Sequence, residues 1–96
     1  MTDEQVQETS CAQVNAEFAR LGVLGHNGQG ADGADGLLAW PSERRDSPGQ
    51  WAWIDVVNER NQDVIYSCRA DFLVERLSRL PTEVSFADAL RAVAGL

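Results

Sequence analysis

Six glycines fall within fifteen residues between positions 22 and 36, and this segment divides the chain into two parts. Glycine loses more conformational freedom on folding than any other residue, so regular structure is entropically costly there. We therefore expect residues 22–36 to form an irregular, flexible connector. One structural element should precede it, and the rest of a single small domain spanning residues 1–96 should follow.

The segment before the connector has the pattern of an amphipathic helix over residues 3–21. Thr2 and Gln5 have the spacing of a capping box, and Gly22 is a natural helix C-cap. The apolar residues that share one side of this helix are Val6, Cys11, Val14, Phe18 and Leu21. The residues expected on the opposite, solvent-facing side are Glu8, Ala12, Asn15, Ala16, Ala19 and Arg20.

The remainder of the chain predicts three strands followed by two helices. Short aromatic and β-branched runs indicate strands over residues 37–40, 51–57 and 63–67, with a turn between the last two. Apolar spacing then predicts a helix over residues 69–80, ended by Pro81, and a second helix from Ser85 to Gly95. This order predicts an α+β fold, in which an antiparallel three-stranded sheet packs on the two C-terminal helices.

The net charge of −7 is concentrated in the first third of the chain. Residues 1–36 hold six acidic residues and one arginine, whereas residues 69–96 hold four of each. Because an acidic chain repels a phosphate backbone, we expect no direct binding of nucleic acid. An acidic surface is instead complementary to a protein with a basic surface, such as a nucleic-acid-binding protein.

The sequence also predicts a compartment and a redox state. The N-terminus lacks a basic patch followed by an apolar run, and the longest uncharged stretch, residues 21–31, is too short to cross a membrane. We therefore expect a cytoplasmic protein with no membrane contact. In that compartment Cys11 and Cys68 should be free thiols rather than a disulfide.

The glycine-rich connector contains two motifs associated with ligands. Gly28, Gly30 and Gly33 form a GxGxxG pattern, but it follows a predicted helix instead of the strand that a dinucleotide site requires. The run GQGADGADGL resembles one turn of the RTX calcium-binding β-rolls, which implies that Asp32 and Asp35 could hold calcium with backbone carbonyls. Those rolls stack several repeats, so one copy does not build the shared ion cage. A small-ligand or metal-binding domain that uses residues 22–36 is the alternative function.

Nothing in the sequence indicates catalysis. The single histidine, His26, has no nucleophile elbow or triad signature near it, and no partner at zinc-ligand spacing. Lysine is absent, which excludes Schiff-base chemistry and a P-loop lysine. A core of this size also leaves little room for an enclosed pocket. We expect no enzyme activity, cofactor or metal.

The aromatic residues are concentrated in the predicted strands. Alternation predicts one sheet face with Trp51, Trp53, Asp55 and Val57, and an apolar opposite face with Ala52, Ile54 and Val56. Exposed tryptophans flanked by polar groups are typical anchors of protein interfaces. The alternative is that the N-terminal helix covers these tryptophans and makes them part of the core.

Together these patterns predict a non-catalytic, acidic protein-binding module that acts as an inhibitor or antagonist of a basic partner. In size, acidity and lack of catalytic motifs it is similar to phage-encoded anti-defence proteins, anti-CRISPRs among them, and to toxin-immunity proteins. This likeness is one of style and assigns no family. A self-associating subunit that pairs its sheet face or edge is a third hypothesis. The predicted partner-binding residues are Trp40, Trp51, Trp53, Asp55, Tyr66, Asp32, Asp35, Glu4 and Glu8.

Overall fold

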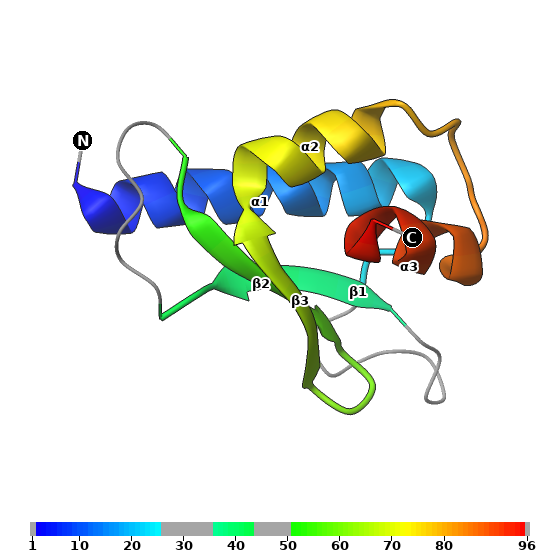
Figure 1. The fold of residues 1–96 in the computed structure, drawn as a ribbon, viewed down its shortest axis with the longest axis horizontal. Helices are drawn as coiled ribbons and strands as arrows, with labels where there is room; N and C mark the ends of the chain where they lie inside the picture. Colours follow the sequence, from blue (N-terminus) through cyan, green and yellow to red (C-terminus); the bar gives the residue numbers. More distant parts are fainter. Residues whose placement is uncertain (1, 26–35, 44–50, 96) are drawn as a thin grey trace.

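The computed structural model describes residues 2–25, 36–43 and 51–95 and confirms the α+β fold. The elements follow one another as α1 (Asp3–Leu21), β1 (Leu37–Pro41), β2 (Trp53–Asn58), β3 (Asp63–Arg69), α2 (Ala70–Ser78) and α3 (Phe86–Ala94). The strands form one antiparallel sheet in the order β1-β2-β3. Figure 1 shows α1 and α2 side by side along one side of the sheet, with α3 near the point where β1 begins in this view.

The boundaries of α1 are those that its capping residues predict. The Thr2 side chain accepts a hydrogen bond from the Gln5 backbone, at 3.2 Å, and the Gln5 side chain accepts one from the Thr2 backbone, at 2.9 Å. Gly22 ends the helix with a φ of 78°, a left-handed conformation that glycine adopts without a Cβ clash. Local sequence signals therefore determine both ends of this helix.

The two C-terminal helices differ in how well the sequence predicts their ends. α2 stops at Ser78, earlier than residue 80, although Leu80 still packs against the core. α3 begins as predicted, because the Ser85 hydroxyl accepts a hydrogen bond from the Asp88 backbone at 3.1 Å.

Two arginines from other helices donate hydrogen bonds to carbonyls at the C-terminal ends of α2 and α3. Arg20 of α1 donates to the carbonyl oxygens of Leu77 and Leu80, at 2.8 and 3.1 Å. Arg76 donates in the same way to the last carbonyls of α3, at 3.1 and 3.2 Å. A cation at this position satisfies carbonyls that have no partner within the helix, and it also interacts favourably with the helix dipole.

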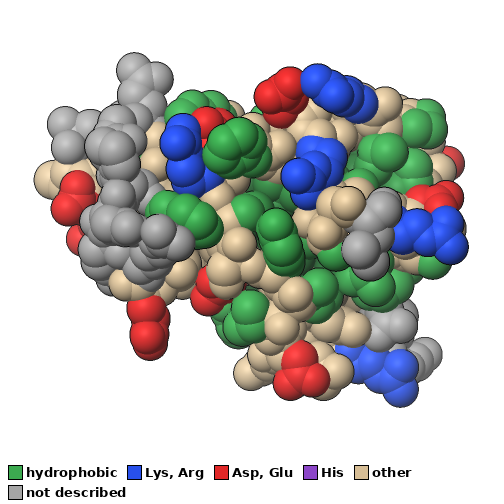
Figure 2. Space-filling model, viewed as in Figure 1, with side chains coloured by type: hydrophobic (Ala, Val, Ile, Leu, Met, Phe, Trp, Pro, Cys, Tyr) green, Lys and Arg blue, Asp and Glu red, His purple; other side chains and the backbone are tan. Residues whose placement is uncertain are grey.

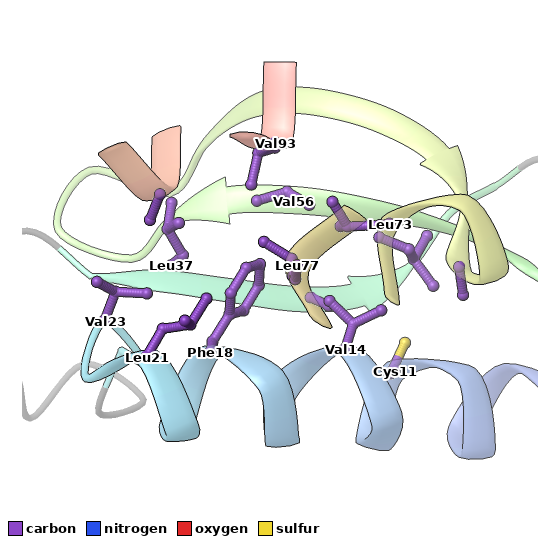
Figure 3. Packing of buried hydrophobic residues seen from close by; sticks show 14 residues of the cluster. Cys11, Val14, Phe18, Leu21, Val23, Leu37, Val56, Leu73, Leu77 and Val93 are labelled. Atoms are coloured by element: carbon purple, nitrogen blue, oxygen red, sulfur yellow. The ribbon is translucent and has the colours of Figure 1, made fainter. Parts of the chain in front are cut away.

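The core lies between the helices and one face of the sheet. Phe18 and Leu21 of α1 are fully buried and point into the space between α1 and the sheet, with Leu77 of α2 nearby (Figure 3). The cluster of buried hydrophobic residues is Cys11, Val14, Phe18, Leu21, Val23, Leu37, Ala39, Ile54, Val56, Ala70, Leu73, Leu77, Ala89 and Val93. Since α1 belongs to this cluster, it docks on the sheet rather than standing free. Within the described residues, the structure contains no helix that is both long and apolar enough to span a bilayer.

Candidate functional site

The sheet face turned away from the helices is the candidate binding surface, and we call it the outer face. In an antiparallel sheet, residues directly opposite one another point to the same face. Trp40 lies opposite Asp55, and Asp55 lies opposite Ser67, so these three side chains form a row across all three strands. Trp53 and Arg69 form the next row. None of these five residues belongs to the core cluster.

A half-buried carboxylate lies at the centre of the outer face. The Ser67 hydroxyl donates a hydrogen bond of 2.6 Å to Oδ1 of Asp55. Trp40 is the cross-strand neighbour of Asp55, and Trp53 is two residues away from it along β2. Both tryptophans are half-buried. The outer face therefore combines a negative charge with two indole rings that are partly exposed to solvent.

The aromatic surface continues from the outer face onto the first turn of α2. Arg69 binds both carboxylate oxygens of Asp71, at 3.1 and 2.6 Å, which fixes its guanidinium group. That group lies 5.3 Å from the centre of the Phe72 ring, within cation–π range. Phe72 is 58% exposed, so its ring adds apolar area beside the tryptophan row.

The structure separates other predicted site residues from this row. Trp51 precedes β2 and packs against the core cluster, so the strand alternation that grouped it with Trp53 does not extend that far. Tyr66 lies opposite Val56, which faces the helices, and it is 38% exposed at the sheet edge. The structure thus brings Trp40, Trp53 and Asp55 together, without Trp51 and Tyr66.

The prediction also named two acidic residues of α1 and two of the glycine-rich connector. Glu4 and Glu8 are exposed on α1, the helix that packs on the opposite side of the sheet. Asp32 and Asp35, together with the GxGxxG and RTX-like motifs, lie outside the described residues. Among residues 2–25, 36–43 and 51–95, no cluster of three or more His, Cys, Asp or Glu side chains is arranged to hold a metal.

The two cysteines are free and their thiols are unreactive in character. Cys11 is buried in the core and Cys68 is half-buried on β3. Burial raises the pKa of each thiol to about 11 from the ordinary 9, and the negative charge of Asp55 adds to both increases. Because the thiolate is the nucleophilic form, this environment disfavours thiol chemistry at neutral pH.

Sequence reasoning missed the polar contacts of α1. Asn15, expected to face solvent, accepts a hydrogen bond from the Ala39 backbone N–H at 2.8 Å and donates one to its carbonyl at 3.0 Å. Gln7 and Ser10 are buried where the helix contacts the ends of β1 and β2. Asparagine is a poor residue for a helix interior, and that cost is the one signal in the sequence for a specific role.

Comparison of the chain with protein-family models, curated proteins and solved structures finds no match. The geometry of the outer face and the charge of the chain are the properties that bear on its function.

Proposed function

We propose that this protein is a non-catalytic binding module that inhibits or antagonises a protein with a basic surface. The observation that carries the proposal is that Trp40, Asp55 and Trp53, from two neighbouring rows, share the sheet face opposite to the one on which the helices pack. Tryptophan and arginine are the residues most enriched among interface hot spots. Arg69 and the exposed Phe72 extend the same surface onto α2.

The charge of the chain supports a basic partner. The chain carries a net charge of −7, and Asp55 contributes one of these charges within the aromatic row itself. A partly desolvated carboxylate that already accepts one hydrogen bond can pair with a cationic side chain of a partner. The remaining acidic residues, on α1 and elsewhere, would accelerate association over a longer range.

A matched pair of substitutions tests the proposal. Asp55→Asn and Glu75→Gln each remove one negative charge, and asparagine can still accept the Ser67 hydrogen bond. Glu75 is an exposed residue of α2 that pairs with Arg79 and does not belong to the sheet. Candidate partners are captured by cross-linking in a lysate of the source cells, and their affinity for each purified variant is measured by calorimetry.

The expected result is that Asp55→Asn weakens binding at least about fivefold, which corresponds to roughly 1 kcal/mol, while Glu75→Gln leaves it unchanged. The association rate of the unsubstituted protein should also fall as the salt concentration rises. If both variants bind equally well, the outer face is not the contact surface. An association rate that does not respond to salt would remove the basic partner from the proposal.

A further inference from the structure

The two edges of the sheet differ in a way that the proposed function does not use. On the β1 edge, the backbone groups of Leu37 bond to Val23 and Gly25, both at 2.8 Å. Ala39 is the next β1 residue whose backbone N–H and carbonyl point away from β2, and both groups are bound by the Asn15 side chain. Pro41 follows and has no N–H group. The β1 edge is therefore closed to a further strand.

The β3 edge is open among the described residues. The Ala52 carbonyl, just before β2, accepts a hydrogen bond of 3.0 Å from Ala70, which follows β3. The next carbonyl, that of Trp53, accepts one of 3.4 Å from Ser42, which follows β1. Successive residues therefore bond alternately toward β3 and toward β1. This alternation continues along an antiparallel ladder. The β3 residues opposite Trp53 and Asp55 are Arg69 and Ser67, and their N–H groups therefore point away from the sheet. The Ser67 carbonyl points outward as well.

Of the three large hydrophobic side chains that are exposed in the described residues, two lie on β3 and the third, Phe72, lies in the first turn of α2, which follows β3 directly. Val64 is 55% exposed, Tyr66 38% and Phe72 58%. Figure 2 shows hydrophobic side chains near the centre of the face on which β3 lies toward the reader in Figure 1. Natural proteins usually protect sheet edges with charge, bulges or covering segments. The described β3 edge has a bulge beside Val56 and charged residues only at its two ends, Asp63 and Arg69.

We propose that a second copy of this chain pairs with β3 and forms a two-fold symmetric dimer. A contact between β3 of one copy and β1 of another is excluded, because the β1 edge is closed. The remaining contact joins two identical edges, so it ends at a dimer and does not grow into a filament. Ser67 lies at the centre of this contact, where its N–H donates to the Ser67 carbonyl of the other copy and its own carbonyl accepts the reciprocal bond.

The surface is complementary to itself in apolar area. Since the paired strands run in opposite directions, the Val64 end of one copy lies beside the Phe72 end of the other. The charge of Arg69 is neutralised by Asp71, and residues 69–96 carry equal numbers of acidic and basic residues. The contact segment, residues 63–72, holds two acidic residues and one arginine, so two copies approach through a segment of low net charge, although each chain has a net charge of −7. The bulge limits the number of paired residues, so the dimer should be weak and reversible.

Sedimentation velocity between about 10 μM and about 1 mM protein tests the dimer, a range chosen for a weak complex. The expected result is a shift from the chain mass of 10.5 kDa toward twice that value. Val64→Lys adds a charge at the contact without removing buried area, and it should keep the protein monomeric and folded at the highest concentration. Glu75→Lys, an exposed substitution on α2 away from β3, is the control and should still dimerise.

Hydrogen exchange gives a second measurement that locates the contact. The peptide containing Ser67 and Arg69 should exchange more slowly at about 1 mM than at about 10 μM, and Val64→Lys should abolish that difference. A chain that stays monomeric at 1 mM overturns the proposal, and so does a dimer that Val64→Lys leaves intact. Binding of a basic partner uses Asp55, so the comparison of Asp55→Asn with Glu75→Gln reports on that function whichever result is obtained here.

Discussion

The contact between Asn15 and Ala39 is the polar interaction of α1 whose loss should have the clearest measurable effect. Asn15→Ala removes two hydrogen bonds, of 2.8 and 3.0 Å, and the N–H and carbonyl of Ala39 at the β1 edge lose these partners. A typical hydrogen bond contributes about 1 kcal/mol to stability, so the loss is about 2 kcal/mol. Alanine gains about 0.6 kcal/mol over asparagine in a helix interior. The net destabilisation should be about 1.4 kcal/mol.

For a domain of this size, that loss corresponds to a fall in Tm of roughly 6–11 °C. Circular dichroism during heating measures it, with Gln13→Ala as the control, because Gln13 is an exposed residue of the same helix. The control should be neutral or slightly stabilising. If the two variants melt at the same temperature, the Asn15 side chain contributes nothing and the reasoning about the β1 edge is wrong.

The same substitution also tests the difference between the two sheet edges. With Ala39 unprotected, a β3 edge can pair with the β1 edge of another copy, and such a head-to-tail contact does not close at a dimer. Asn15→Ala should therefore form species larger than a dimer at about 1 mM protein, at a temperature where it remains folded. Sedimentation velocity would contradict this expectation if the variant and the unsubstituted protein showed the same size distribution.

Two further predictions concern the thiols and Arg20. Burial raises the pKa of Cys11 and Cys68 to about 11, so the unfolded chain releases these thiol protons first as pH rises above 9. The free energy of unfolding should therefore fall between pH 9 and 11, by up to about 1.4 kcal/mol per pH unit for each thiol. In urea unfolding, the variant with both cysteines replaced by alanine should not show this fall with pH. Arg20→Lys keeps the charge, but lysine has no planar fork with which to bond the carbonyls of both Leu77 and Leu80, now at 2.8 and 3.1 Å. The substitution should lower the free energy of unfolding by about 1 kcal/mol in the same urea assay, and equal stability of the two proteins would refute this expectation.

Local signals predicted the capped ends of α1 and α3 well, because the capping residues lie within a few residues of those ends, whereas α2 has no capping side chain at its N-terminus. The Thr2 capping box, Gly22 and Ser85 lie where the spacing indicates, and they determine where α1 begins and ends and where α3 begins. The strands are shifted by one or two residues, because their ends depend on pairing partners that are distant in the sequence. Trp51 illustrates this limit, since it continues the alternation of β2 but lies before the strand and packs against the core.

The contacts of α1 could not be predicted, because they join residues far apart in the chain. Asn15 binds Ala39, 24 residues later, and Arg20 binds Leu77, 57 residues later. A helical wheel separates apolar from polar positions, but it does not distinguish a polar residue in water from one that bonds to a neighbouring element. The wheel therefore predicts that both side chains face solvent, although both are half-buried.

The choice of which sheet face the helices cover depends largely on one charge. β2 carries Ile54 and Val56 on one face and Asp55 between the tryptophan positions on the other. If the helices packed on the face with Asp55, a carboxylate with a single hydrogen bond from Ser67 would lose its water, which costs several kcal/mol. Packing on Ile54 and Val56 has no such cost, since both are apolar and become fully buried. Asp55 thus keeps Trp40 and Trp53 out of the core, and the same carboxylate provides the charge by which we expect a basic partner to bind.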